Sequence, residues 1–165
     1  MKRLACVFLL IATPLSAAPL SAGQGDQPAT LTKPHFVSQR GAEAFLREGP
    51  SYQHKILWVY RHRGYPFMVT ASFDVWRRVQ AADGAVGWMS ATMLSEQRTV
   101  LVTGKGQAQI RESADGGKVV GLADPGAIAA LKSCAPNACH IRGEDIDGWI
   151  PRDRIWGVAK DEIFK

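Results

Sequence analysis

The feature of this sequence that most constrains its fold is an internal repeat. Leu46-Arg47-Glu48 returns as Ile110-Arg111-Glu112, and Gly87-Trp88 returns as Gly148-Trp149. The surroundings of the second pair agree as well, because DGAVGWMSATML is echoed by GEDIDGWIPRDRI. Such internal similarity is typical of a chain that builds one structural unit more than once. We therefore expect two units of similar fold, over residues 36–97 and 98–157.

The texture of each unit predicts β-strands. Short stretches rich in Val, Ile, Trp, Phe and Tyr alternate with Gly, Pro, Asp and Ser at intervals of roughly ten residues, and no segment has a long helical period. In the alignment of the two units, Gly64-Tyr65-Pro66 falls opposite Asp124-Pro125-Gly126. Five short strands followed by one helical turn make a small, partly open barrel. The expected strands are 44–46, 56–60, 67–73, 76–80 and 86–89 in the first unit and 108–110, 119–122, 128–132, 139–142 and 149–150 in the second, with helical turns at 91–94 and 152–155.

The start of the chain has the parts of a secretory signal peptide. Met1-Lys2-Arg3 is basic, residues 4–13 form an apolar run, and small residues follow. This order predicts export and removal of residues 1–23, and the apolar run is too short to anchor the chain in a bilayer. We expect a periplasmic or extracellular protein with no stable membrane insertion after cleavage. Residues 24–35 are polar, which predicts a flexible tether, and residues 158–165 are expected to form a C-terminal tail.

The stretch LKSCAPNACHIR places Cys134 at the end of one expected strand and Cys139 at the start of the next. The two residues then lie across the neck of a hairpin, where opposite Cα atoms are about 4.5 to 5.5 Å apart, within the range that a disulfide requires. An exported chain also meets oxidising conditions. We predict a disulfide between Cys134 and Cys139 that stabilises the second unit by about 2 kcal/mol.

Three other uses of this motif are weaker. A haem attachment with His140 as axial ligand would need a helical pocket, and zinc would need four ligands. A Cys139 nucleophile with His140 as its base would need both side chains on one face, whereas neighbouring residues of a strand point to opposite faces. We therefore predict no catalytic residue, no metal site and no cofactor.

The run from Trp58 to Pro66 interleaves aromatic and basic side chains. Such a run can present a stacking and cationic surface to a glycan, a peptide or an acidic partner, because aromatic rings and Arg are frequent at binding hot spots. The alternative, which small barrels favour, is that the rings fill the core and the basic turn is solvated. The candidate ligand-binding residues are Trp58, Tyr60, Arg61, Arg63, Tyr65, Trp76, Arg78 and Trp88.

Residues that recur in register indicate shared structural roles. Trp88 and Trp149 follow glycine at equivalent places, which favours core packing over ligand contact. Arg47 and Arg111 also recur, and we expect each to hold nearby backbone carbonyls rather than a ligand.

Four motifs follow in order in the first unit: Leu46-Arg47-x-Gly49-Pro50, the Gly64-x-Pro66 turn, Trp76-Arg77-Arg78-Val79 and Gly87-Trp88. Together they resemble the bacterial SH3-like (SH3b) domain, in the group of short exported proteins with two tandem copies. The resemblance implies an all-β fold of two tandem SH3-like small β-barrels, without catalytic machinery, and a role in targeting or binding. The second unit lacks the Gly-Pro pair and has Ala138 in place of Trp76, which argues against independent ligand binding by it but not against its fold.

The formal net charge of +5 favours anionic partners such as acidic wall polymers, lipid headgroups or acidic proteins. An exported protein seldom meets nucleic acid, so we expect none as a partner. We expect a non-enzymatic binding or adaptor module of the bacterial cell envelope that recognises peptidoglycan or an envelope protein. The alternative is a cell-wall hydrolase, or a regulatory or inhibitory partner of one. A hydrolase would need His and carboxylate side chains that converge in a cleft.

Overall fold

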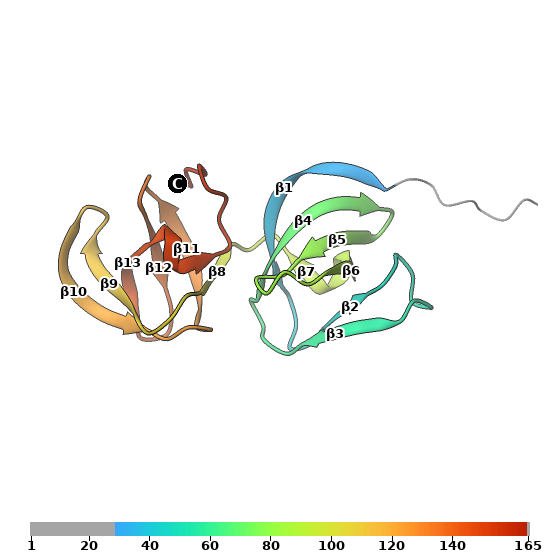
Figure 1. The fold of residues 1–165 in the computed structure, drawn as a ribbon, viewed down its shortest axis with the longest axis horizontal. Coiled ribbons are helices and arrows are strands. Elements are labelled where there is room, and N and C mark those ends of the chain that lie inside the picture. Colours follow the sequence, from blue (N-terminus) through green and yellow to red (C-terminus); the bar gives the residue numbers. More distant parts are fainter. Residues whose placement is uncertain (1–28, 165) are drawn as a thin grey trace, which may run out of the picture.

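The computed structural model describes residues 29–164, so the predicted signal peptide lies outside the described residues. This part of the chain forms fourteen strands and two single turns of 3-10 helix. The strands make two separate seven-stranded sheets, which lie side by side as two small barrels (Figure 1). No helix over residues 29–164 is long and apolar enough to cross a membrane.

The first barrel consists of strands β1 to β7. Its strand order across the sheet is β3-β2-β6-β5-β4-β1-β7. The largest fully buried side chains of its core include Phe67, Leu46 and Met89. Its elements are β1 (Thr30–Gln39), β2 (Ala44–Arg47), β3 (Ile56–Tyr60), β4 (Pro66–Phe73), β5 (Trp76–Gln80), β6 (Val86–Ser90), the 3-10 turn η1 (Ala91–Met93) and β7 (Leu94–Ser95).

The second barrel consists of strands β8 to β14. Its strand order is β10-β9-β13-β12-β11-β8-β14, which matches the first barrel strand for strand. The predicted all-β fold of two SH3-like small barrels is confirmed. Its elements are β8 (Thr99–Val102), β9 (Ala108–Ser113), β10 (Gly116–Ala123), β11 (Ile128–Cys134), β12 (Ala138–Arg142), β13 (Asp147–Pro151), the 3-10 turn η2 (Arg152–Arg154) and β14 (Ile155–Trp156).

The backbone corrects the predicted alignment of one turn. Gly64 has φ 82° and donates its N–H to the carbonyl of Gln39, while Gly126 has φ 92° and donates to the carbonyl of Val102. Gly126 is therefore the counterpart of Gly64, so the alignment of Gly64 with Asp124 was wrong by two residues. The turn needs a positive φ, which glycine adopts without strain and proline cannot adopt. The glycine, and not the proline, marks the equivalent position.

The predicted tether at residues 24–35 is wrong for its second half. Strand β1 already begins at Thr30, which lies opposite Ser72 of β4, and His35 lies opposite Val69. The side chains of this segment are mostly exposed, so its order comes from backbone pairing with β4 and not from an apolar face. Residues 24–28 lie outside the described part of the chain.

The two barrels contact each other through backbone and aromatic groups. The hydroxyl of Thr99 donates a 2.6 Å hydrogen bond to the carbonyl of Gly64, and the indole N–H of Trp156 donates to the carbonyl of Pro66 at 3.2 Å. The Trp156 ring also meets the ring of Phe36 edge to face, with centroids 5.2 Å apart. The start and end of the second barrel thus pack against the first.

The C-terminal residues fold back onto the second barrel. The N–H of Cys134 donates to the carbonyl of Phe164 at 2.7 Å. Glu162 forms an ion pair with Arg98, a residue between the barrels, with Nη2 and Oε2 3.1 Å apart. Both side chains are mostly buried, with 16% and 23% exposed. The Arg98 guanidinium lies over the rings of Phe36 and Phe164, so this ion pair links the C-terminal residues to both barrels.

Candidate functional site

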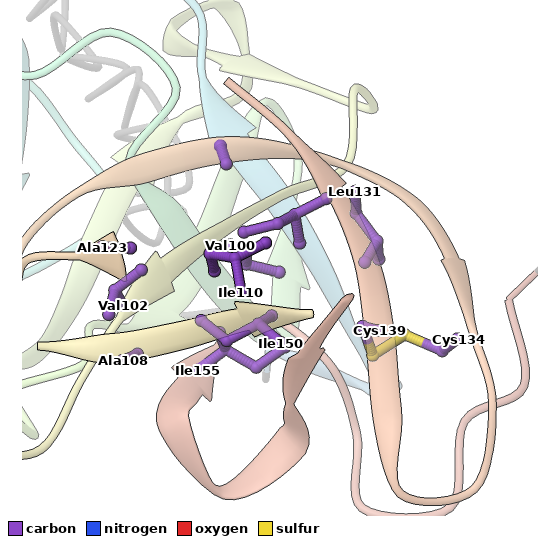
Figure 2. Close-up of a cluster of buried hydrophobic side chains, with 12 residues drawn as sticks. Val100, Val102, Ala108, Ile110, Ala123, Leu131, Cys134, Cys139, Ile150 and Ile155 are labelled. Atoms are coloured by element: carbon purple, nitrogen blue, oxygen red, sulfur yellow. A yellow bond between two sulfur atoms is a disulfide. The ribbon is translucent and has the colours of Figure 1, made fainter. Parts of the chain in front are cut away.

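The Cys134–Cys139 disulfide is present, as predicted, and belongs to the core of the second barrel. The two residues lie directly opposite each other in the register of β11 and β12, with Cα atoms 4.0 Å apart. Both side chains are buried beside Leu131 and Ile150 (Figure 2). His140 follows on the outer face, where its ring stacks on Trp149. Both sulfurs are bonded to each other, so neither is a thiolate that could ligate a metal or attack a substrate.

The outer face of the first barrel carries a row of three residues on neighbouring strands. Trp88 of β6 lies opposite Arg47 of β2 on one side and opposite Arg78 of β5 on the other. Residues directly opposite in a sheet share a face, with Cβ atoms about 4.5 to 5.5 Å apart. We call Arg47, Trp88 and Arg78 the first outer row.

The second barrel repeats this row with one change. Trp149 of β13 lies opposite Arg111 of β9 and opposite His140 of β12, so that histidine stands where the first row has Arg78. The rings of His140 and Trp149 are nearly parallel, with centroids 5.3 Å apart and an interplanar angle of 19°. We call Arg111, Trp149 and His140 the second outer row.

A carboxylate fixes the histidine of the second outer row. Nε2 of His140 lies 2.6 Å from Oδ1 of Asp147, and Nε of Arg142 donates to Oδ2 of Asp147 at 2.8 Å. The hydrogen bond from Arg142 is the main cause that holds the pKa of Asp147 below its usual range, and the contact with His140 adds to it. Asp147 therefore stays ionised and orients the His140 ring on Trp149.

The arginines of both rows hold backbone, as predicted. Nη1 of Arg47 donates to the carbonyls of Tyr52 and His54, at 3.0 and 2.8 Å. Nη1 of Arg111 donates to the carbonyl of Gly117 at 3.0 Å. Each arginine thus closes the hairpin that follows it.

The tryptophans of both rows correct a prediction. Trp88 and Trp149 are half-buried on the outer faces and are not core residues. The glycine before each one faces inward instead. A Cβ on Gly87 would lie 2.6 Å from the carbonyl oxygen of Arg47, and one on Gly148 would lie 2.8 Å from that of Arg111. The Gly-Trp pair recurs because glycine lets two strands approach closely, which turns the next side chain outward.

The barrels differ beside their outer rows. In the first barrel, Trp76 at the start of β5 is only 5% exposed, because the ring of Tyr52 packs on it with centroids 4.9 Å apart. Trp76 was a candidate ligand contact, and its burial under Tyr52 leaves little of the indole exposed. Its indole fills the space between the β2–β3 hairpin and β5, so a ligand cannot reach it while Tyr52 stays in place.

The second barrel leaves the corresponding space open. Ala138 lies opposite Pro151, just as Trp76 lies opposite Ser90, so Ala138 occupies the position of Trp76. A hollow of about 420 Å³ lies there, between the β9–β10 turn and the start of β12. We call it the second-barrel hollow. Its lining includes Arg111, Asp115, Asn137, Ala138, Trp149 and Pro151.

Comparison with known families identifies the domain type of the first barrel. Residues 40–96 match the family model described as the bacterial SH3 domain. The protein contains a bacterial SH3 domain. The match covers the chain from just after β1 to the end of the first barrel, so the family resemblance inferred from the sequence is confirmed there.

Two solved structures match part of the chain with low TM-scores. NlpC2 from Trichomonas vaginalis is 11% identical, with a TM-score of 0.34, over 75% of this chain and 48% of that one. NlpC1 from the same organism is 13% identical, with a TM-score of 0.33, over 86% of this chain and 50% of that one. This chain therefore spans about half the length of either protein. No curated protein sequence matches the chain.

The predicted ligand residues of the bacterial SH3 domain do not share one face. Trp58 of β3 lies opposite Leu46, whereas Trp88 lies opposite the next residue, Arg47. Because successive residues of β2 point to opposite faces, Trp58 and Trp88 do as well. Arg78 and Trp88 belong to the outer row, and Trp58 lies on the other side of the sheet at its edge. These residues remain candidates, but as two separate surfaces.

The remaining candidates near β3 divide between core and solvent. The rings of Tyr60 and Tyr65 pack on Phe67 of the core, with centroids 4.9 and 5.0 Å from it. Burial raises the pKa of both phenols, with a smaller contribution from the negative charge of Asp83. Arg61 is exposed and pairs with Glu43 at 3.0 Å, and Arg63 is exposed. The two tyrosines therefore pack against the core while staying half-buried, and their contact with a ligand remains a prediction.

Proposed function

We propose that this protein is a non-enzymatic binding module of the bacterial cell envelope that recognises peptidoglycan or an envelope protein. The match to the bacterial SH3 domain supports a binding role in general. The observation that carries the proposal is the second-barrel hollow, which lies beside Trp149 at the position that Trp76 fills in the first barrel. The proposed contact surface is therefore in the second barrel.

The lining of the hollow fits a ligand with both polar and flat apolar parts. The face of an indole supports a sugar ring or a peptide plane, and the amide of Asn137 and the carboxylate of Asp115 offer hydrogen bonds at its rim. Peptidoglycan combines sugar rings with short peptides that carry carboxylates and amines. The net charge of +5 also favours the anionic polymers of the wall.

The test is sedimentation with purified sacculi at low and moderate salt, using the protein without residues 1–23. We expect the protein to pellet with the wall. Trp149→Ala should remain largely in the supernatant, because it removes the wall of the hollow. The matched variant Trp88→Ala changes the same position of the first outer row and should pellet like the unmodified protein. Equal loss in both variants would contradict the assignment to the second barrel.

Two further outcomes separate the alternatives. If the unmodified protein stays in the supernatant at every salt concentration, wall binding is excluded, and a pull-down from envelope extract then tests for a protein partner that Ala138→Trp no longer captures. Release of soluble muropeptides during the incubation would contradict a non-enzymatic module and support the hydrolase alternative.

A further inference from the structure

Strand β3 is an edge of the first sheet. It pairs with β2 on one side, and in the described residues 29–164 no strand pairs with its other side. An edge strand presents backbone N–H and C=O groups that can accept another strand. Proteins usually protect such an edge with a charge, a proline or a short strand. The five residues of β3, Ile-Leu-Trp-Val-Tyr, include neither a charged residue nor a proline.

The exposed side chains of β3 are large and apolar. Ile56, Leu57 and Trp58 are 39%, 40% and 59% exposed. The second barrel does not repeat the tryptophan, because Gly121 of β10 lies opposite Ile110 just as Trp58 lies opposite Leu46. Trp58 is thus specific to the first barrel, and the strand order that the two barrels share does not depend on it.

Basic residues flank this apolar edge. Lys55 precedes β3, and Arg61 and Arg63 follow it. Arg61 pairs with Glu43, but within residues 29–164 neither Lys55 nor Arg63 has an ion-pair partner. Two copies of β3 would therefore pair poorly. An antiparallel pair brings Lys55 of one copy toward Arg61 of the other, a parallel pair sets like residues together, and like charges across a sheet are destabilising.

We propose that β3 is a docking edge for an extended segment of a partner protein that has apolar residues in its middle and acidic residues at its ends. The segment adds a strand beside β3, with backbone hydrogen bonds to the edge, apolar contact with Trp58 and carboxylates near Lys55 and Arg63. This inference goes beyond the proposed function, because it concerns another barrel and the opposite side of its sheet from the outer row.

The test uses two synthetic peptides of alternating valine and threonine, one with glutamates at both ends and one with lysines. Binding to the protein without residues 1–23 is measured by calorimetry, and hydrogen exchange locates the contact. We expect the acidic peptide to bind, to bind more weakly at high salt, and to protect the amides of β3. The basic peptide should not bind.

Two substitutions give the matched control. Trp58→Lys places a charge on the edge and should weaken binding of the acidic peptide by about tenfold or more, the usual effect of losing an aromatic anchor. Leu122→Lys makes the same kind of change on β10, where Leu122 is 51% exposed, and should leave binding unchanged. If Trp58→Lys melts below the unmodified protein, Leu57→Lys replaces it.

The proposal is overturned if neither peptide binds, if both bind equally, if binding survives Trp58→Lys, or if the protected amides lie outside β3. None of these results depends on sacculi, so failure here leaves the sedimentation result of the proposed function standing, and the reverse also holds.

Discussion

The two barrels have the same strand order and the same Gly-Trp position, yet their surfaces differ at two equivalent places. The first barrel fills the space beside its outer row with Trp76 and exposes Trp58 at its edge. The second has Ala138 and Gly121 at these positions, so it has an open hollow and an edge without an aromatic anchor. The two units share their strand order, their buried apolar positions and the glycines at which two strands approach closely. They differ in the residues on the surface of the sheets.

The cores differ in the size of their buried side chains. The first core buries Phe67 and Met89, and Trp76 is buried nearby. Among residues 29–164, the buried residues of the second core are Val, Ala, Ile and Leu together with the two cysteines, and the aromatic Phe164 packs against them only partly buried. Smaller side chains remove less apolar surface from water. The second core thus consists of smaller side chains, and the covalent link between β11 and β12 adds a constraint that the first core lacks.

The largest expected effect comes from removing the anchor of the first barrel. Trp76→Ala should lower the free energy of unfolding by about 3 kcal/mol or more, because truncating a buried aromatic residue leaves a cavity. Urea denaturation followed by circular dichroism measures this. Ser90→Ala lies opposite on the neighbouring strand and serves as a control with a much smaller effect. A cost below about 1 kcal/mol would mean that Trp76 does not anchor its barrel.

The disulfide should contribute next. Replacing Cys134 and Cys139 with serine should cost about 2 kcal/mol, because the loop that the bond closes is short. The loss of structure should appear first in the second barrel. In nuclear magnetic resonance spectra recorded at increasing urea concentration, the amide signals of Ile110 and Ile150 should broaden before those of Leu46 and Phe67. Simultaneous loss in both barrels would show that the two units unfold as one body.

Filling the hollow makes the second barrel more like the first. Ala138→Trp should lower the free energy of unfolding by no more than about 3 kcal/mol, because Ala138 is buried but the hollow beside it has room for part of the indole. The fraction of the Ala138→Trp protein that pellets with sacculi should nevertheless fall to the level measured for Trp149→Ala. Unchanged sedimentation with an intact fold would show that the hollow is not the contact site.

The smallest expected effect concerns the ion pair that links the C-terminal residues to both barrels. The hydrogen bond from Arg98 lowers the pKa of Glu162 below its ordinary value of 4.5, with burial opposing it. A lowered pKa in the folded state means that the stabilisation is complete above this ordinary value and is lost as pH falls through the folded-state pKa.

The free energy of unfolding should therefore fall between pH 6 and a pH below about 4. This fall should be about 1 kcal/mol larger in the unmodified protein than in Glu162→Gln. Asp161→Asn, at an exposed neighbour, should keep the pH dependence of the unmodified protein. An identical pH dependence in Glu162→Gln would mean that the pair contributes nothing to stability.

Much of this fold could be predicted from local patterns. The predicted bounds of β3 and β5 coincide with the observed ones, and the disulfide followed from the hairpin register. Strand β1 could not be found, because Thr30 to His35 owe their order to backbone pairing with a distant strand and not to an apolar period. The outward direction of Trp88 was missed because the close approach of β2 to Gly87 is a tertiary contact.

The candidate site shows the same limit. The sequence revealed that Ala138 replaces Trp76, and we took this as a sign against ligand binding by the second unit. In the structure a hollow lies beside Trp149, at the position that the Trp76 ring fills in the first barrel. The hairpin geometry that brings Asp115 and Asn137 to the same hollow has no local sequence signal.

The most direct test of the central claim, that the second barrel and not the first takes the wall ligand, uses the five indole N–H signals of the protein in nuclear magnetic resonance. Muramidase-solubilised peptidoglycan fragments are added, and each signal is assigned by substitution. The account predicts that the indole signal of Trp149 shifts while those of Trp76 and Trp88 stay in place. A shift at Trp88 with Trp149 unchanged, or no shift at any of the five, would contradict it.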